Sequence, residues 1–401
     1  MTNSDKPGRL HPKVHEARNL MEGGRMDRRE FVRIAALLGV SARAAYSMAG
    51  VRPSFAAQAG LPLPQDDDMD KEGGILKVGM QVQKMEDPAT YAWVEMSNQT
   101  RHMLEHLTFT TPDNVTQPML AESWEASDDL KTWTFKLRKG IMWHNGDELN
   151  ADDIIFNMTR WMDPGIGSSN IGLSTFASMV EEVDSGEKND DGTPKKIKKM
   201  IPGAVEKVDD YTVRLTLSKP VLSVAEDLYN YPTAIVHRSF KPPLSDNPIG
   251  TGAFTLTNLK VGERCELKRV TEAGGKPFEY WGGKVYVDEI HYYNFDEDNQ
   301  LTAFASGDVD AIYEFGIEQF ELAEALEGEI IEARTAQTVC ARMRVTEKPF
   351  DDEKVRKAVI MSCDNSVYRD LVFQGRGDIG ENHHVSPIHP EYYALPELKR
   401  D

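Results

Sequence analysis

The chain has 401 residues, of which 40% are hydrophobic and 28% are charged, as is typical of folded globular proteins and not of disordered ones. A chain of this length exceeds what one hydrophobic core usually serves, so we expect two or more lobes. The formal net charge is −19, although residues 1–59 carry 10 Lys and Arg against 5 Asp and Glu. The strongly acidic remainder repels phosphate backbones and anionic lipid headgroups, so we expect neither nucleic acid nor a membrane surface as a partner.

The N-terminal region carries an ordered pattern of export features. Arg28 and Arg29 precede an aromatic and an aliphatic residue, an apolar stretch follows over residues 34–40, and Ala57-Gln58-Ala59 has the small residues that a signal peptidase reads. This order resembles the twin-arginine export signal. We therefore expect residues 1–59 to be a signal peptide read by the twin-arginine translocase. The alternative is a basic amphipathic helix of the folded protein.

The same region argues against membrane anchoring. Its apolar stretch is far shorter than the roughly 20 residues that span a bilayer. Residues 1–60 contain no cysteine, so no thiol is available for a lipid anchor. We therefore expect a freely diffusing periplasmic protein, with residues 60–73 as a linker rich in Pro, Gln, Asp and Gly.

Strand patterns follow in the body of the chain. Residues 75–80 read as a first strand. Residues 131–138 alternate strictly, with Trp133, Phe135 and Leu137 on one face, as a strand buried on one side requires. Residues 211–217 repeat this alternation. The charged segment 181–200 predicts a solvated loop or hairpin.

Helix patterns interleave with these strands. Asn150 can cap a helix in which Ile154, Met158 and Trp161 share one face. A second amphipathic helix is predicted around residues 355–362, with Asp351 and Asp352 as capping candidates. Strands and helices alternate without an exact repeat, which predicts a mixed α/β architecture of several lobes.

The three cysteines, Cys265, Cys340 and Cys363, have spacings that match neither a zinc site nor a disulfide framework. We expect them to be small buried residues, with a single disulfide as the alternative. The histidines at 383, 384 and 389 form only a weak metal pattern, and we predict no metal site and no cofactor. Paired carboxylates at 128–129, 152–153 and 351–352 lie beside turns or helix starts, where aspartate serves as a cap.

Several sequence blocks occur in one order. They are Pro118–Glu125, Phe135–Gly140, Trp143–Gly146, Ala151–Ile154, Gly250–Phe254, Ala305–Asp310 and Pro349–Ala358. Together they resemble the extracellular solute-binding protein family 5, the dipeptide, oligopeptide and nickel-binding group. Ala253 replaces the proline that is usual in the family's glycine-rich loop. Trp124, Trp133, Phe135 and Trp161 within these blocks are expected to be core residues.

The resemblance implies a multi-lobed α/β periplasmic binding protein (type II-like, cluster C) in which two large lobes close over a ligand at a hinge. On this basis residues 74–110 begin lobe I, 111–240 form an inserted subdomain, 241–338 continue lobe I, and 339–401 begin an incomplete lobe II. The implied function is non-enzymatic: a monomeric substrate-binding component of an ABC importer for peptides or peptide-like solutes, with the transporter permease as a partner. Opines, oligosaccharides and nickel chelates are alternative ligands.

The resemblance also suggests ligand-contacting residues. They are Met85, Glu86 and Asp87 in the loop after the first strand, Tyr313 and Phe315, and Arg342 and Arg344 on a strand at the hinge. The two arginines would favour a carboxylate or another anion, whereas a surface ion pair is the alternative for them and core packing the alternative for the aromatic pair.

Two other classes of function remain as alternatives: an exported metal-dependent hydrolase, and a truncated remnant without binding activity. The sequence contains none of the motifs of serine hydrolases, phosphate-binding loops or zinc proteases.

Overall fold

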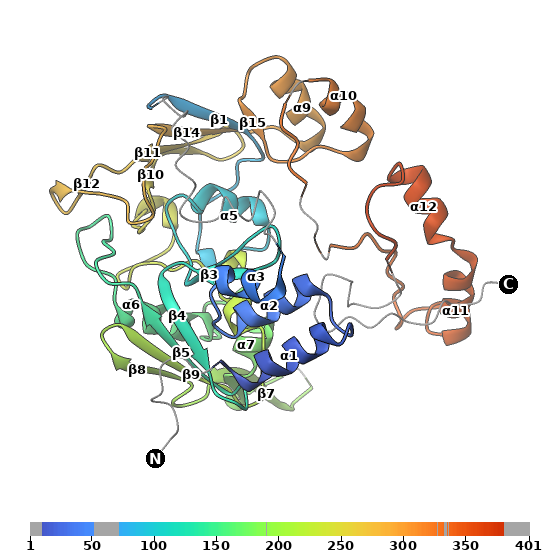
Figure 1. The fold of residues 1–401 in the computed structure, drawn as a ribbon, viewed down its shortest axis with the longest axis horizontal. Helices are drawn as coiled ribbons and strands as arrows, with labels where there is room; N and C mark the ends of the chain where they lie inside the picture. The colour runs from blue at the N-terminus through green and yellow to red at the C-terminus, as the bar shows by residue number, and fades with distance from the viewer. Residues whose placement is uncertain are drawn as a thin grey trace. The chain divides into compact units, whose positions relative to one another are not determined.

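The computed structural model describes residues 10–51, 72–189, 191–326, 328–332, 335 and 337–380. The chain divides into two compact units between Glu314 and Phe315, and each is described by itself. The five β-sheets found among these described residues all lie in the first unit, and Figure 1 shows how its elements are arranged. Among the described helices, none combines the length and the apolar character that crossing a membrane requires.

One five-stranded sheet has the order β10-β11-β14-β1-β15. Its strands are β1 (Ile75–Gly79), β10 (Phe254–Lys260), β11 (Arg264–Arg269), β14 (Glu289–Tyr293) and β15 (Ala311–Ile312). β14, β1 and β15 run parallel, whereas β10, β11 and β14 pair antiparallel. The core on this sheet contains Met80, Met85, Leu267 and Tyr292. The first predicted strand is therefore confirmed as β1.

A four-stranded antiparallel sheet has the order β4-β5-β9-β8. Its strands are β4 (Ala121–Ala126), β5 (Thr132–Leu137), β8 (Val205–Asp209) and β9 (Thr212–Thr216). The predicted alternation over residues 131–138 is confirmed, because Trp133, Phe135 and Leu137 are at most 2% exposed. Trp124 and Trp161 are buried in the same core, as predicted.

Helix α6 (Ala151–Trp161) packs against β8 and β9. Asn150 and Asp153 form a capping box at its start, in which each side chain accepts a hydrogen bond from the other's backbone and satisfies a free N–H of the first turn. Ile154, Met158 and Trp161 are fully buried on its inner face. The predicted cap and apolar face are therefore both confirmed.

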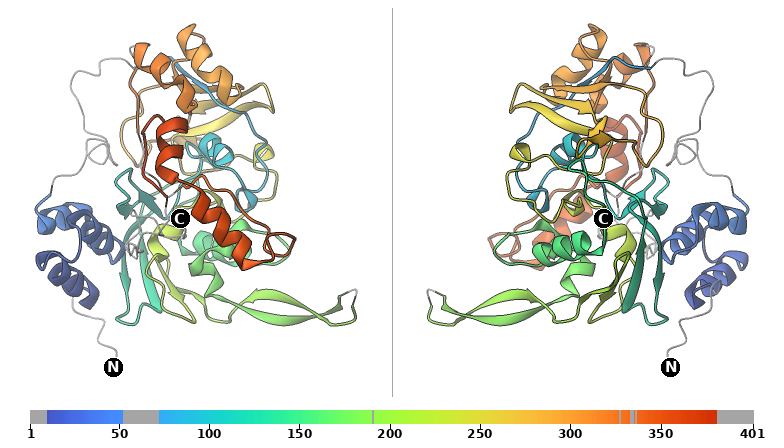
Figure 2. Two further views of the ribbon diagram at one scale, coloured as in Figure 1. Left: turned by 90° about the vertical axis from the view of Figure 1, so that its right-hand side faces the viewer. Right: turned by 90° about the vertical axis from the view of Figure 1, so that its left-hand side faces the viewer.

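The remaining elements of the first unit are short or peripheral. They are α1 (Pro12–Glu22), α2 (Arg28–Leu37), α3 (Ala42–Ala49), η1 (Pro88–Thr90), α5 (Val94–Thr100), β2 (Thr108–Thr110), β3 (Thr116–Pro118), η2 (Ser169–Gly172), α7 (Ser174–Ala177), β6 (Val180–Lys188), β7 (Pro194–Met200), α8 (Val224–Asp227), η3 (Tyr231–Thr233), η4 (Leu244–Asp246), β12 (Glu272–Ala273), β13 (Lys276–Pro277) and α9 (Glu297–Ala305). β6 and β7 form the predicted charged hairpin, which projects as a ribbon (Figure 2).

The second unit contains η5 (Ile317–Gln319), α10 (Phe320–Ala325), α11 (Glu353–Ser362) and α12 (Asn365–Val372). Asp352 caps α11 as predicted, although no residue of α11 is buried. Within this unit the Arg376 guanidinium lies over the Phe320 ring.

The cysteine prediction is only partly confirmed. Cys265 is buried, whereas Cys340 is exposed and Cys363 is half-buried, and all three thiols are free. The prediction fails for the latter two because they lie in the second unit, where the neighbouring helix α11 buries none of its residues.

The N-terminal region contains three helices that pack into the first unit. Phe31 and Val32 of α2 are fully buried in the core shared with β4 and β5, whereas Arg28 and Arg29 are exposed. The cleavage pattern Ala57–Ala59 lies outside the described residues, as do the histidines at 383, 384 and 389.

Candidate functional site

The candidate site lies where the parallel strands of the five-stranded sheet end. β1, β14 and β15 run in one direction, so the loops that follow them emerge at one edge. In open α/β sheets, ligands bind outside the carboxyl ends of parallel strands. The loop after β1 includes the predicted residues Met85, Glu86 and Asp87, and Tyr313 follows β15 directly.

Hydrogen bonds fix the loop after β1. The Val82 N–H donates to Asn294 Oδ1 at 2.8 Å, just beyond β14. Gln99 of α5 holds the next residue from both sides, accepting from the Gln83 N–H at 2.7 Å and donating to the Gln83 carbonyl at 2.9 Å. Met85 is 1% exposed in the core, whereas Glu86 faces solvent. The loop is therefore anchored with alternate side chains pointing in and out.

Asp87 is buried and already engaged. One carboxylate oxygen accepts from the Ala89 N–H at 3.0 Å, and the other contacts Arg160 Nη2 of α6. The Arg160 guanidinium lies over the Phe240 ring, 4.9 Å from its centre. Both partners are nearly buried, so this ion pair positions the loop. The Asp87 carboxylate faces the Arg160 guanidinium.

A cavity of about 410 Å³ opens beside this loop. Its lining residues are Lys84, Glu86, Asp87, Thr90, Tyr91, Met96 and Pro242. Lys84 and Glu86 lie 3.7 Å apart and are both exposed, so the rim carries both charges. Burial raises the pKa of Tyr91. Trp93, two residues after Tyr91 in the chain, is 64% exposed and offers a large aromatic surface to solvent.

Tyr313 and Glu314 form another part of this edge. The Tyr313 N–H donates to the Gly79 carbonyl at 3.0 Å, and Gln300 Oε1 also lies within hydrogen-bond distance of both residues' N–H groups. The Tyr313 ring remains 37% exposed. Burial, and then the carboxylates of Glu297 and Glu95, raise the pKa of Glu314.

The other predicted site residues lie in the second unit. The Phe315 ring packs 5.9 Å from that of Phe320. Arg342 and Arg344 are exposed, and Arg344 forms an ion pair with Glu347 at 3.0 Å. The strand predicted for residues 342–345 is absent from this part of the described chain. The segment pairs with no neighbouring strand there, so no backbone hydrogen bonds between strands hold it extended.

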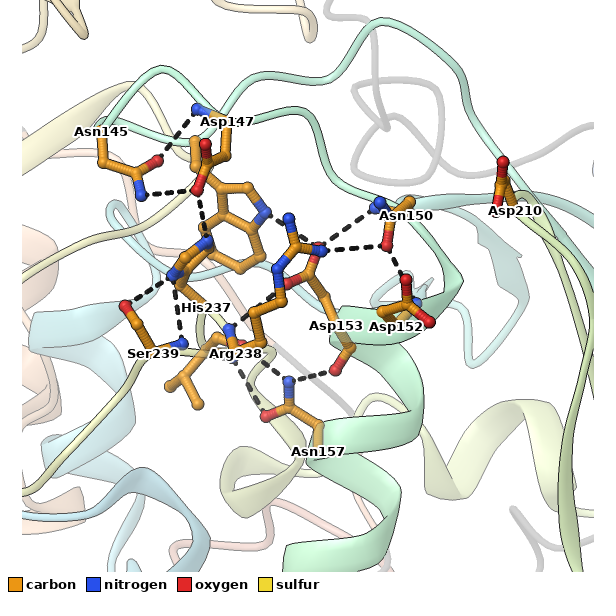
Figure 3. Close-up of polar contacts among 12 residues, drawn as sticks. Asn145, Asp147, Asn150, Asp152, Asp153, Asn157, Asp210, His237, Arg238 and Ser239 are labelled. Atoms are coloured by element: carbon orange, nitrogen blue, oxygen red, sulfur yellow. Dashed lines mark hydrogen bonds and ion pairs between the residues drawn. The ribbon is translucent and has the colours of Figure 1, made fainter.

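A polar cluster at the start of α6 contains a serine, a histidine and an aspartate (Figure 3). His237 Nδ1 lies 2.7 Å from Ser239 Oγ, and His237 Nε2 lies 3.0 Å from Asp147 Oδ2. This order is the reverse of a catalytic triad, in which the aspartate faces Nδ1 and the serine faces Nε2. Ser239 is only two residues from His237, so the contact belongs to a local turn.

The rest of this cluster is structural as well. Asp153 accepts from Trp143 Nε1 at 3.2 Å and from the Arg238 N–H at 3.2 Å. Asn157 pairs with both backbone groups of Val236 (Figure 3). These bonds attach α6 to the segment around residues 236–239. Across the described ranges, no group of three or more His, Cys, Asp or Glu residues is arranged to hold a metal ion.

Sequence reasoning missed Arg160, Tyr91, Met96, Trp93 and Pro242 at this edge. Arg160 follows Ile154 and Met158 on α6 and reads as a solvent-facing charge. Predicting that Arg160 is buried would have required knowing its contact with Asp87, which lies 73 positions away in the chain. Trp93 has no pattern around it that separates a surface role from a core role.

The comparisons with known proteins agree with this architecture. Residues 115–400 match the family model described as bacterial extracellular solute-binding proteins, family 5 Middle. The chain belongs to this family. It is 30% identical to the periplasmic oligopeptide-binding protein OppA of Haemophilus influenzae, and the match covers 83% of this chain and 60% of that relative.

Solved structures of family 5 relatives show the same fold. Haemophilus influenzae OppA in complex with the peptide RPPGFSPFR matches with a TM-score of 0.60 and 27% identity, over 76% of this chain and 59% of that one. DppA from Helicobacter pylori in complex with the peptide STSA matches with a TM-score of 0.60 and 21% identity, over 77% of this chain and 60% of that one. The chain thus spans about 60% of the length of these relatives.

Proposed function

We propose that the protein is the periplasmic solute-binding component of an ABC importer and that it binds peptides or peptide-like solutes. Membership of family 5 supports this proposal, and so do relatives that are named for binding oligopeptides. The observation that carries it is the cavity of about 410 Å³ at the carboxyl edge of the parallel strands, with Lys84 and Glu86 at its rim. A peptide presents charges of both signs and many hydrogen-bonding groups, which this rim suits.

Exposed aromatic residues of the first unit belong to the proposed site. Trp93 and Tyr313 offer exposed aromatic surface at the edge of the first unit. Phe315, Arg342 and Arg344 belong to the second unit, and we propose them as ligand contacts of that unit. Hinge closure buries the solute and creates the form that the transporter permease recognises. The protein acts as a monomer and performs no chemistry on its ligand.

The proposed location is the periplasm, reached through the twin-arginine translocase. Arg28 and Arg29 begin α2 and are exposed, as a receptor for the pair requires. Replacement of both by lysine should leave the protein in the cytoplasm, as fractionation of expressing cells would show. A protein that still reaches the periplasm would refute this route.

Binding can be tested by thermal shift with tri-alanine, a nonapeptide, an opine and a nickel–histidine chelate. A ligand at about 100 times its Kd stabilises the native state by roughly 2.7 kcal/mol, which appears as a raised Tm. We expect shifts with the peptides. A shift with the opine or the chelate alone would identify one of the alternative ligands.

Two substitutions localise the binding. Trp93→Ala should weaken peptide binding because it removes an exposed aromatic surface two residues from Tyr91, which lines the cavity. Val208→Ala is the matched control, since Val208 is an exposed apolar residue, 43% accessible, on β8 of the other sheet. Equal effects of the two substitutions would place the ligand elsewhere.

A further inference from the structure

The N-terminal helices bury the apolar residues that follow the arginine pair. In α2, Phe31, Val32, Ala35 and Ala36 are 0% exposed and Leu37 is 1% exposed. α2 packs against α1, α3, β3 and α8. A helix that is a free export signal would leave this surface available. Here it belongs to the hydrophobic core that also contains Trp124 and Trp133.

Polar contacts from all three helices reinforce this burial. From α2, Arg33 Nη2 pairs with Glu226 Oε1 at 2.7 Å, and the Leu37 carbonyl accepts from Trp124 Nε1 at 2.9 Å. From α3, the Tyr46 hydroxyl donates to Asp113 Oδ2 at 2.9 Å. From the cap of α1, His11 Nε2 lies 3.1 Å from the Ser127 carbonyl oxygen.

Shape complementarity is equally specific. Gly39 follows α2 with a φ of +86°, and a Cβ at this position would overlap the carbonyl oxygen of Trp124. Only glycine both adopts this conformation readily and permits this approach. The turn after α2 is therefore closely fitted to residues 72–314, which we call the body of the first unit.

We propose that residues 10–51 are an intramolecular ligand of the body of the first unit, and that their docking withholds the apolar part of the export signal from the export machinery. This inference rests on the export role proposed for Arg28 and Arg29. In the docked state the arginine pair is exposed while Phe31 to Leu38 are buried. α2 cannot occupy its place beside Trp124 and a site on the translocase at the same time.

Export then depends on how often the segment undocks. The apparent affinity of the signal for the translocase is reduced by the fraction of molecules in which α2 is free. Weakening the docked state should therefore speed export without any change in the signal sequence. Removal of residues 10–51 would also expose the apolar surface around Trp124 on the mature protein.

The test changes the body and leaves the signal untouched. Glu226→Lys places a cation against the Arg33 guanidinium, whose side chain is only 9% exposed. Glu206→Lys is the matched control, because Glu206 is exposed on β8 and pairs with the exposed Arg214. Hydrogen exchange of the purified precursor and the rate at which processed protein appears in cells are measured for each.

We expect slow amide exchange over Phe31–Leu37 in the unmodified precursor. Glu226→Lys should accelerate this exchange about tenfold or more and should raise the processing rate, because breaking a buried ion pair favours the open state. Glu206→Lys should change neither. Exchange over Phe31–Leu37 as fast as in an unstructured peptide would overturn docking. Faster exchange in Glu226→Lys without faster processing would overturn its role in export.

The two proposals fail in different ways. If replacing Arg28 and Arg29 by lysine leaves localisation unchanged, the twin-arginine route is wrong, yet the exchange data still decide whether the segment docks. If the lysine pair blocks export and Glu226→Lys has no effect on processing, the route stands and docking does not control it. Exported protein that retains residues 10–51 would show the segment to be a permanent part of the fold and would overturn the inference.

Discussion

Trp281 donates its indole N–H to Glu105 Oε2 at 2.7 Å, and this carboxylate is buried among neutral groups. Thr251 and Tyr280 donate to the same carboxylate at 2.7 Å each. Glu105 thereby connects the glycine-rich loop at Gly250–Gly252 with the segment at residues 280–281. Burial raises its pKa to about 7, although the three hydrogen bonds favour the charged form.

The raised pKa of Glu105 makes stability depend on pH. The folded state holds this proton more tightly than the unfolded state, so its stabilising contribution is complete below about pH 4.5 and is lost as the pH rises towards 7. The loss is on the order of 3 kcal/mol. In Glu105→Gln the group no longer titrates, and the amide can still accept from Thr251 and Trp281.

Urea unfolding at pH 5 and pH 7.5 measures this contribution. The difference in unfolding free energy between the unmodified protein and Glu105→Gln separates the contribution of Glu105 from those of other groups. Among these groups are His102 and His106, whose pKa values burial lowers to about 4 and about 3. Those histidines act with the opposite sign and are present in both proteins. Parallel pH profiles would contradict the assignment.

Arg160 should be needed for the stability of the loop at the candidate site. Arg160→Ala leaves the Asp87 carboxylate buried without its cation, which typically costs about 3–5 kcal/mol. Arg214→Ala breaks an exposed ion pair with Glu206 and should cost less than about 1 kcal/mol. Chemical denaturation compares them, and equal costs would mean that the buried pair does not hold the loop.

Gly252 should tolerate no larger residue. A Cβ there would overlap the backbone of His102 and Met103, which is fixed by a hydrogen bond from the Gly252 N–H to the Met103 carbonyl at 2.9 Å. We expect Gly252→Ala to lower the free energy of unfolding by about 3 kcal/mol. Gly172→Ala is the control, since a Cβ added there would have no atom within 4 Å, and it should change stability by less than about 1 kcal/mol.

The β6–β7 ribbon should be dispensable for folding. Val183 faces Ile197 in its register, so an Asn-Gly turn can join these residues and delete the outer part. The side chains removed are almost all exposed and pair within the ribbon, as Lys195 does with Glu187 at 2.8 Å. We expect the free energy of unfolding to change by no more than about 1 kcal/mol in urea titrations. A larger loss would reveal a contact of the ribbon with the core.

Local periodicity explains which elements were predictable. Residues 132–137 and 151–161 bury one face against neighbours, and the alternation of Trp133 and Phe135 or the spacing of Ile154 and Met158 records that burial directly. For α1 to α3 the sequence left a free signal and a helix of the folded protein as alternatives, because arginines followed by a short apolar stretch are common to both.

The candidate site was predictable only as a loop. The segment after β1 was identified from the family resemblance, yet its order of residues did not show that Met85 is core and that Asp87 faces Arg160. Such contacts join residues far apart in the chain and leave no local pattern. Arg342 and Arg344 were expected on a strand, but alternation within four residues cannot supply the partner that a strand needs.

The pairing of β1 has a consequence for the order of events during synthesis. Gly74, just before β1, bonds to Asp288, 214 positions later, and β1 lies between β14 and β15. A ribosome releases the N-terminal strand long before either neighbour exists, whereas β4, β5, β8 and β9 can assemble earlier from a contiguous stretch. The nascent chain must therefore keep β1 unpaired until β14 (Glu289–Tyr293) emerges near the end of the first unit, so the backbone hydrogen-bonding groups of this strand stay exposed during most of its synthesis.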